Sequence, residues 1–393
     1  MSFGASIVCL NAFLPLLVRS HPSLQTEAEE IPPEEQALYR AVPQDDDSTA
    51  VHVDITPSAT RKSLLLSTRI STQGIAIGYT SGMLLQLATI PLVILTGSTT
   101  KSLQLAVLMA GLWWAIFSIP AALWMRPRPG PPLPASKTTN RFKMLIGYIL
   151  YGWKMIFATL YQARRLKDVV FFLAAWFLLS DGYTTITSTA ILFAQTTLGI
   201  EPSGLAGIGI IATGSGILGA ILWPRVLTPR LKFLHNSPHK TILFILVLSL
   251  FIPLYGLLGF LPLFQRLGFG GITSKPEIYV VAFLFGFLYG GVQGYCRSLF
   301  GELVPRGMEA NMFALYAVTD KGSSALGPMV VGLITDLTHE IRWGFAFLGA
   351  LLAASIPLMA QIDVVRGKAD AEAWGLERET VNEEEEARIR LNE

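Results

Sequence analysis

The length of the apolar runs constrains this chain more than any other feature. Nine segments are dominated by apolar side chains and reach about 20 residues, the length that an α-helix needs to cross roughly 30 Å of hydrocarbon. Hydrophobic residues make up 51% of the 393 residues, and charged residues only 15%. The pattern predicts an all-α, polytopic membrane protein. The nine predicted spans are residues 2–18, 72–96, 103–124, 169–195, 205–227, 241–264, 278–299, 312–336 and 343–362.

The loops between these spans differ in their content of basic residues. Alternate loops on one side hold twenty Lys and Arg residues, whereas the opposite loops hold only Lys101, Arg266, Lys275 and Arg342. Cytosolic loops carry an excess of Lys and Arg, so the richer side is predicted to face the cytosol together with the C-terminal tail. Because the basic residues are dispersed among loops, the net charge of +2 does not predict a nucleic-acid surface.

Three segments between the spans stand apart in composition. Residues 19–69 are rich in Glu, Asp, Pro and Ser, include the consecutive aspartates Asp45–Asp47, and are predicted to form a solvated cytosolic loop. A stiff proline-rich stretch follows at 126–134. Residues 141–167 combine apolar residues at helical spacing with six basic residues. That combination favours an amphipathic helix lying on an anionic leaflet over a tenth span.

The basic linker divides the spans into three and six. The sequence therefore predicts four parts: the last three spans of a first bundle at 1–125, a cytosolic linker at 126–168, a six-helix bundle at 169–363 and a cytosolic tail at 364–393. A secondary transporter of the major-facilitator type is built from two such bundles. We therefore expect three further spans before Met1, so that about nine of twelve are present. A complete nine-span design is the alternative.

A carboxylate lies in the middle of the span at 169–195. Asp181 is followed by Gly182 and by several Ser and Thr hydroxyls. Charges at this depth are rare and functional by default, so Asp181 is a candidate for binding a substrate ammonium group or a proton. The alternative is a charge that pairs with a neighbouring helix for assembly alone.

Asp320 and Lys321 lie side by side in the penultimate apolar run. Neighbours on a helix point about 100° apart, so we expect each of the two to have its partner elsewhere. The following Gly327-Pro328 predicts either a broken helix that lines a cavity or a kink with close helix packing. Lys321 lies only about 5 Å cytosolic of its helix centre. The sequence thus predicts a switchable pair of Lys321 with Asp181, with Asp320 facing the cytosolic entrance.

The end of the span at 278–299 carries four further candidates. Gln293 and Tyr295 are polar residues in its last turns and are candidate substrate contacts, whereas the glycines around them predict close helix packing. Arg297 and Glu302 lie at the cytosolic edge and are candidates for a gate pair. An arginine that extends toward the headgroups is the alternative reading of Arg297.

The sequence gives no sign of catalysis. The five histidines lie in predicted loops, and His235 and His239, the one pair with metal-ligand spacing, flank Pro238. Neither a metal site nor a cofactor is therefore predicted. A nucleotide-binding signature is also missing from the sequence, which disfavours ATP-driven transport. We do not expect an enzyme.

Four stretches of the sequence carry a more specific pattern. They are GASIVCLNAFLPLLVRSHP from Gly4, STRISTQGIAIGYTSGMLLQ from Ser67, FLLSDGYTTITSTAILFAQTTLGI from Phe177 and FGELVPRGMEANMFALYAVTDKGSSALGPMVVGLITD from Phe300. These stretches resemble one family of fungal membrane proteins, the autophagy-related vacuolar amino-acid effluxers numbered twenty-two among autophagy proteins. The resemblance implies a major-facilitator-like fold in the vacuolar membrane. It also implies export to the cytosol of amino acids released by autophagic breakdown, leucine and other neutral ones among them. In that family the first stretch resembles the fourth span.

Two functions of different classes stay open. The first is a secondary transporter that moves amino acids out of the vacuole. The second is a membrane scaffold, or a truncated isoform that does not transport, which recruits partners through its acidic loop and tail. The intramembrane charges Asp181, Asp320 and Lys321 favour transport, because a scaffold has no reason to retain buried charge.

Overall fold

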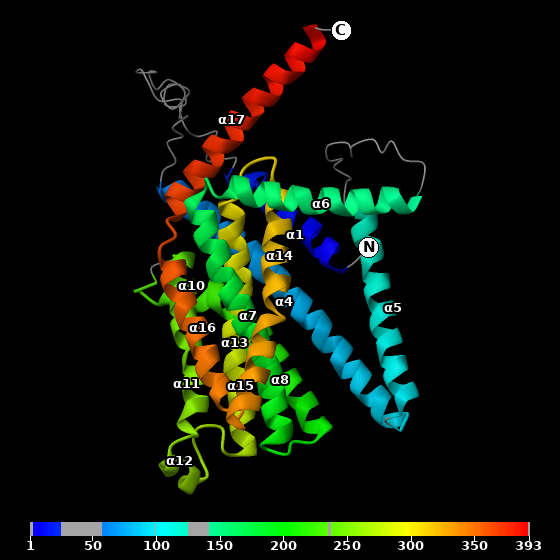
Figure 1. Ribbon diagram of the computed structural model, residues 1–393, viewed down its shortest axis with the longest axis vertical. Helices are drawn as coiled ribbons and strands as arrows, with labels where there is room; N and C mark the ends of the chain where they lie inside the picture. The colour runs from blue at the N-terminus through cyan, green and yellow to red at the C-terminus, as the bar shows by residue number, and fades with distance from the viewer. Residues whose placement is uncertain (1–2, 25–56, 98, 125–140, 235–236, 392–393) are drawn as a thin grey trace. The chain divides into compact units, whose positions relative to one another are not determined.

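The computed structural model describes residues 3–24, 57–97, 99–124, 141–234 and 237–391. All regular elements in these ranges are helices (Figure 1), which confirms the predicted all-α class. Asp45–Asp47 and the proline-rich stretch at 126–134 lie outside the described residues. The helices are α1 (Phe3–Arg19), α4 (Pro57–Leu95), α5 (Thr100–Trp124), α6 (Arg141–Ala163), α7 (Lys167–Thr196), α8 (Pro202–Leu222), the π-helix η1 (Trp223–Leu227), α9 (Thr228–Arg230), α10 (Pro238–Ser249), α11 (Phe251–Leu258), α12 (Pro262–Leu267), α13 (Lys275–Glu302), α14 (Glu309–Ser323), α15 (Leu326–Thr338), α16 (Trp343–Ala360) and α17 (Val364–Leu391).

Nine helices in the described part of the chain are long and apolar enough to cross a membrane. Eight of them overlap a predicted span, and the ninth is α6, the segment predicted to be amphipathic. The predicted span at 312–336 does not qualify, because it is interrupted between α14 and α15 and each piece is short. The number agrees with the prediction, but the membership differs by these two segments.

The described residues form two compact units. The larger contains residues 1–76 and 155–393, and the smaller contains residues 77–154, so that α4 and α6 each contribute to both. Within the smaller unit, Nε1 of Trp113 on α5 donates a hydrogen bond of 2.9 Å to Oγ of Ser81 on α4. This bond satisfies an indole N–H that has no water to bond within hydrocarbon.

Two helices organise the larger unit. α7 packs against α14, α15 and α16, and α13 packs against α8 and α10. Glycines bring α13 close to α8, because a Cβ built on Gly286 would lie 2.0 Å from the carbonyl oxygen of Ala212, and one on Gly290 would lie 2.1 Å from that of Gly216. The prediction that these glycines serve close helix packing is confirmed.

The C-terminal tail has more contacts than its composition indicates. A charged composition is typical of a solvated end, but α17 begins at Val364 and its base packs against α7 and α13. Gly367, Ala371 and Gly375 are buried at four-residue spacing, so this face of α17 is flat enough to approach the bundle. A composition dominated by charge did not reveal this narrow stripe of small residues.

The α8–α13 contact makes a direct stability prediction. Gly290→Ala places a methyl group against the Gly216 backbone, and overpacking of this kind costs about 1–3 kcal/mol. We expect a lower melting temperature in detergent, measured by the loss of monodisperse protein on heating. Gly209→Ala on α8 is the matched control, because a Cβ there meets no atom within 4 Å. Equal melting temperatures for the two variants would contradict this packing.

Candidate functional site

The predicted penultimate span is broken at Ser324 and Ala325, between α14 and α15. Pro328 explains the position of the break, since it lacks the N–H that would bond the carbonyl group of Ser324, and its ring crowds that carbonyl. Proline is tolerated in the first turn of a helix, where α15 places it. Figure 1 shows α15 following α14 along the bundle, with α7 beside them. The predicted interruption is present, and it is accompanied by close packing of Gly327 against α7.

Two consecutive residues of α7 bond the two sides of this break. Oγ of Ser180 donates to the carbonyl oxygen of Asp320 at 3.0 Å and to its Oδ1 at 2.6 Å. Oδ1 of Asp181 accepts a hydrogen bond of 2.9 Å from the backbone N–H of Gly327, in the first turn of α15. The first N–H groups of a helix have no partner within it and carry its positive dipole end. A carboxylate therefore caps α15 from a neighbouring helix.

Gly327 is the residue that permits this approach. A Cβ at this position would lie 1.8 Å from Oγ1 of Thr185 and 2.7 Å from Oδ1 of Asp181. Asp181 itself is 3% exposed, and Thr185 contributes a second, long hydrogen bond of 3.5 Å to the same oxygen. The two hydrogen bonds to the Asp181 carboxylate, from the Gly327 N–H and the Thr185 hydroxyl, thus both come from uncharged groups.

Lys321 departs from its predicted pairing. Its Nζ lies 2.8 Å from Oδ2 of Asp320, so the two neighbours form an ion pair with each other. The expectation that they do not neutralise each other was wrong, because the four-carbon lysine side chain reaches across the 100° that separates them. The Asp320 side chain is 20% exposed and that of Lys321 is 69% exposed. Asp181 meets α15 in this structure, and not Lys321.

An aromatic stack lies one helical turn from these polar bonds. The rings of Trp176 on α7 and Tyr316 on α14 are 4.9 Å apart, and Phe172 and Phe300 pack beside them. Trp176 and Tyr316 precede Ser180 and Asp320 by four residues each, so the stack and the polar bonds share one helix–helix seam. The sequence reading did not single out Trp176, Tyr316 or Ser180. The sequence signal that could have identified them is their four-residue spacing, from Trp176 to Ser180 on α7 and from Tyr316 to Asp320 on α14.

A second polar cluster surrounds Glu302 at the end of α13. Its carboxylate accepts hydrogen bonds of 2.7 and 2.9 Å from Oγ of Ser63 on α4, and Nζ of Lys368 on α17 lies 2.9 Å from Oε2. The partner of Glu302 is therefore Lys368 and not the predicted Arg297. Nη1 of Arg297 instead donates to the side-chain oxygen of Asn11 on α1 at 3.0 Å. The predicted gate residues thus take part in two separate contacts.

Hydroxyl groups continue this contact along α4. Oγ1 of Thr68 lies 2.8 Å from Oγ of Ser298, and Thr72 packs so closely against Gly294 that a Cβ there would lie 2.4 Å from Cγ2 of Thr72. Together with the bond between Ser63 and Glu302, they form a buried face at four- to five-residue spacing, which we call the α4–α13 seam. A seam of hydroxyls and glycine permits close approach with weak, exchangeable bonds.

Arginine 19 at the end of α1 adds a further link. Its Nη1 lies 2.9 Å from Oε1 of Glu309 on α14, and its Nη2 donates to the carbonyl oxygen of Val304 at 3.1 Å. α1 is therefore joined to the first turn of α14, close in sequence to the end of α13 that contacts α4.

The base of α17 is fixed by a buried carboxylate. Asp168, which is 1% exposed, accepts hydrogen bonds from Nε and Nη2 of Arg366 at 2.9 and 2.8 Å and from the backbone N–H of Asp363 at 2.8 Å. The hydrogen bond and the negative charge of Asp168 raise the pKa of Arg366. The bidentate geometry fixes the angle of α17 as well as its attachment.

Gln293 and Tyr295 have partners within the bundle. Nε2 of Gln293 donates to the hydroxyl of Tyr289, one turn earlier on α13. The hydroxyl of Tyr295 lies 2.6 Å from Oγ1 of Thr228, and its ring is 1% exposed. Tyr295 thus joins α13 to α9, and a ligand reaches it only if the bundle rearranges.

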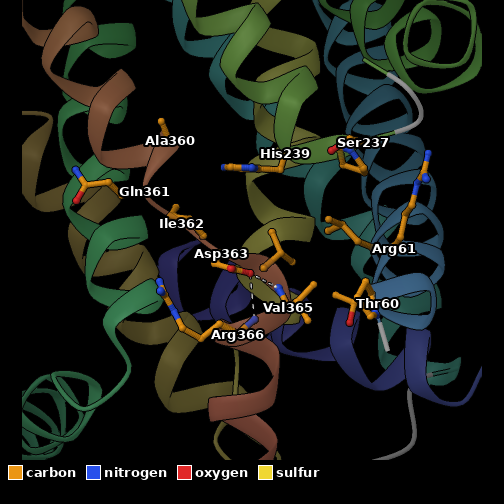
Figure 2. Close-up of a pocket in the computed structure, with 14 residues that line it drawn as sticks. Thr60, Arg61, Ser237, His239, Ala360, Gln361, Ile362, Asp363, Val365 and Arg366 are labelled. Carbon is orange, nitrogen blue, oxygen red and sulfur yellow. Dashed lines mark hydrogen bonds between the residues drawn. The ribbon is translucent and has the colours of Figure 1, made fainter. Parts of the chain in front are cut away.

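A pocket of about 530 Å³ opens between the first residues of α4, α10 and α17 and the last residues of α16 (Figure 2). Asp363 lies in its centre, where its carboxylate accepts the backbone N–H groups of Val365 and Arg366. His239 borders the pocket, and its Nε2 lies 2.8 Å from the carbonyl oxygen of Met359. Among the described residues lining this pocket are none of the predicted substrate or gate residues. His235 lies outside the described residues.

Comparison with known proteins gives the family. A family described as "Vacuole effluxer Atg22 like" matches residues 1–372. This chain belongs to the Atg22-like vacuole effluxer family.

Curated members of the Atg22-like family are similar over nearly all of this chain. Autophagy-related protein 22-2 of Sclerotinia sclerotiorum is 44% identical over 94% of the chain, and Autophagy-related protein 22 of Pyricularia oryzae is 47% identical over 94%. Autophagy-related protein 22 of Neurospora crassa is 46% identical over 95%. The match covers 59%, 56% and 53% of these three relatives, so the chain spans little more than half of their length. The resemblance seen in the four sequence stretches is confirmed.

The docking of α17 in this Atg22-like protein makes a testable prediction. Arg366→Gln leaves the buried carboxylate of Asp168 without its cation, at a cost of roughly 1–3 kcal/mol. We expect α17 to detach from the bundle and to be cut faster by a protease in detergent. Arg378→Gln, on an exposed position of the same helix, is the matched control. Cleavage at the same rate in both variants and in the unaltered chain would rule out this attachment.

Proposed function

We propose that this chain is a vacuolar membrane effluxer that exports amino acids, released by autophagic breakdown, to the cytosol by secondary transport. Its membership of the Atg22-like vacuole effluxer family supports the class of function and the membrane. The nine long apolar helices in the described part of the chain support a multi-pass protein. The substrate, the mechanism, the major-facilitator-like arrangement and the cytosolic position of the C-terminus belong to the proposal.

The single observation that carries the proposal is the ion pair between Asp320 and Lys321 beside a broken helix. An amino acid at neutral pH carries one ammonium and one carboxylate group. Such a zwitterion replaces the internal pair without adding net charge, with its carboxylate on Lys321 and its ammonium on Asp320. Substitution of one pair by another avoids leaving an unpaired charge inside the membrane, which is costly.

The break between α14 and α15 gives this exchange a mechanical consequence. Ser180 bonds the same Asp320 carboxylate that pairs with Lys321, at 2.6 Å from Oδ1. When a substrate ammonium group binds that carboxylate, the hydrogen bond from Ser180 to the same oxygen is either shared with the ammonium group or broken. After the substrate leaves, Lys321 pairs either with Asp320 again or with the carboxylate of Asp181, which is the alternative pair predicted from the sequence.

The α4–α13 seam and the cluster at Glu302 are proposed to form the cytosolic gate. Glu302 is joined to α4 through Ser63 and to α17 through Lys368. In alternating access, two groups of helices separate on one side while they close on the other. Hydroxyl contacts suit such a gate, since each contributes only a modest free energy and re-forms easily.

Efflux from isolated vacuoles tests the proposal. The chain is expressed in a yeast strain that lacks its own protein of this family, and the vacuoles are loaded with radiolabelled leucine. Lys321→Gln and Asp320→Asn are each expected to reduce leucine release about tenfold or more, because each removes one charge-assisted contact of roughly 1.5–3 kcal/mol. Lys275→Gln, at a lysine whose Nζ donates to the backbone carbonyl of Gly199 at 3.3 Å, is the control.

Three results would count against this function. Full leucine release by both the Lys321 and Asp320 variants would show that these two residues do not form a zwitterion-binding site. Equal loss in Lys275→Gln would point to a general effect of charge. No release by the unaltered chain, with normal delivery to the vacuole, would favour the membrane scaffold.

A further inference from the structure

The segment from α6 to the start of α7 is uniformly basic. Residues 141–167 contain six Lys and Arg residues and no Asp or Glu. The side chains of Arg141, Lys143 and Lys154 are exposed, as are those of Arg164 and Arg165 just after the helix. The segment therefore carries charge of one sign along its whole length and fits a surface of opposite sign.

The position of the charge within α6 argues against a crossing helix. Lys154 lies two residues from the middle of α6, next to Trp153 and close to Tyr151 and Tyr148. In helices that cross a bilayer, Lys residues and the interfacial residues Trp and Tyr gather at the two ends. α5 follows that rule for charge, since Lys101 in its first turn is its one charged residue. By length and composition alone α6 could cross a membrane, but the position of Lys154 and Trp153 near its middle argues against a crossing helix.

Much of the apolar surface of α6 lies away from its two lysines. Lys143 and Lys154 are eleven residues apart, so they lie within about 20° of each other around the helix axis. The exposed Leu150 and Phe157 lie within about 60° of the lysines. Leu145, Ile149 and Leu160 lie about 100–180° away from the lysines on the same projection. These three apolar side chains are 56%, 52% and 38% exposed. Exposed apolar groups opposite aligned lysines describe an interfacial helix.

We propose that α6 lies along the headgroup layer of an anionic membrane leaflet, with Leu145, Ile149 and Leu160 in the acyl boundary and Lys143 and Lys154 at lipid phosphates. The partner is an anionic phospholipid surface, whose negative potential attracts basic segments beside membrane helices. A surface helix also preserves the bias of twenty basic residues against four between the two sides. A spanning α6 would invert the side of every later loop.

Measurement of depth distinguishes a surface helix from a crossing one. Single cysteines replace Leu145, Ile149 or Leu160 in a Cys9→Ala background and carry an environment-sensitive fluorophore. Cys296 is fully buried and stays in place. The chain is reconstituted into lipid nanodiscs that contain lipids brominated at either a shallow or a deep acyl position. Leu105, Leu112 and Ile119 on α5, which are 44%, 53% and 57% exposed, provide a matched series along a predicted span.

The three α6 positions are expected to be quenched alike, and more strongly by the shallow than by the deep lipid. The α5 series is expected to be graded, with the deep lipid acting most strongly at Leu112. The α6 positions are spaced over about 22 Å of helix. A graded series on α6, with one position quenched mainly by the deep lipid, would overturn the proposal in favour of a span. Absence of quenching at all three would overturn it in favour of a helix in water.

A second arm tests the charge of the partner. Adding phosphatidylserine to phosphatidylcholine nanodiscs is expected to increase shallow quenching at Ile149. The increase is expected to be lost in the double variant Lys143→Gln, Lys154→Gln. The increase should persist when Arg266 and Lys275 are both replaced by Gln, because that double variant removes the same number of positive charges at positions outside α6. Equal responses of the two double variants would contradict an anionic lipid as the partner.

Discussion

The larger unit depends on one carboxylate placed against the start of a helix. Burying an ionised Asp without a cation is costly unless hydrogen bonds replace its water. Asp181 is 3% exposed and receives the backbone N–H of Gly327, which belongs to the positive end of α15. That N–H exists as a free donor only because the helix is broken. The break and the buried charge therefore stabilise each other.

This mutual dependence explains why small residues surround the site. Gly327 leaves room for the oxygens of Asp181 and Thr185, and Ser180 reaches the carboxylate of Asp320 at 2.6 Å. The stacked rings of Trp176 and Tyr316 then fix α7 against α14 one turn away. A rigid aromatic contact next to exchangeable polar bonds is an arrangement in which one helix half can change partners while the other stays packed.

The sequence predicted those features that depend on local composition. Runs of about 20 apolar residues were enough to predict the all-α class, and Gly327-Pro328 was enough to predict the interruption between α14 and α15. The family followed from four sequence stretches. Each of these signals lies within a few residues of the structure that it determines.

Features that depend on the choice of neighbour were not predictable in the same way. Lys321 lies next to Asp320 in sequence, and only its rotamer decided that the two would pair. Glu302 was predicted to pair with Arg297, five residues away, but it meets Lys368, which is 66 residues away on α17. The docking of α17 depends on three small residues in a charged segment, and average composition conceals such a stripe. Charge and length predict which residues need partners, whereas the tertiary packing decides which partners they obtain.

Hydrogen exchange at the start of α15 is the most direct measurement of the central claim. Asp181→Leu keeps a side chain of similar shape but cannot accept the N–H of Gly327. In the unaltered chain, peptides covering residues 324–331 are expected to exchange slowly, and in Asp181→Leu they should exchange several-fold faster, while the first turns of α14 stay unchanged. Thr187→Val, six residues further along α7 at an exposed position, serves as the control and should behave like the unaltered chain. Equal exchange of residues 324–331 in Asp181→Leu and the unaltered chain would contradict the claim that the Asp181 carboxylate stabilises the first turn of α15.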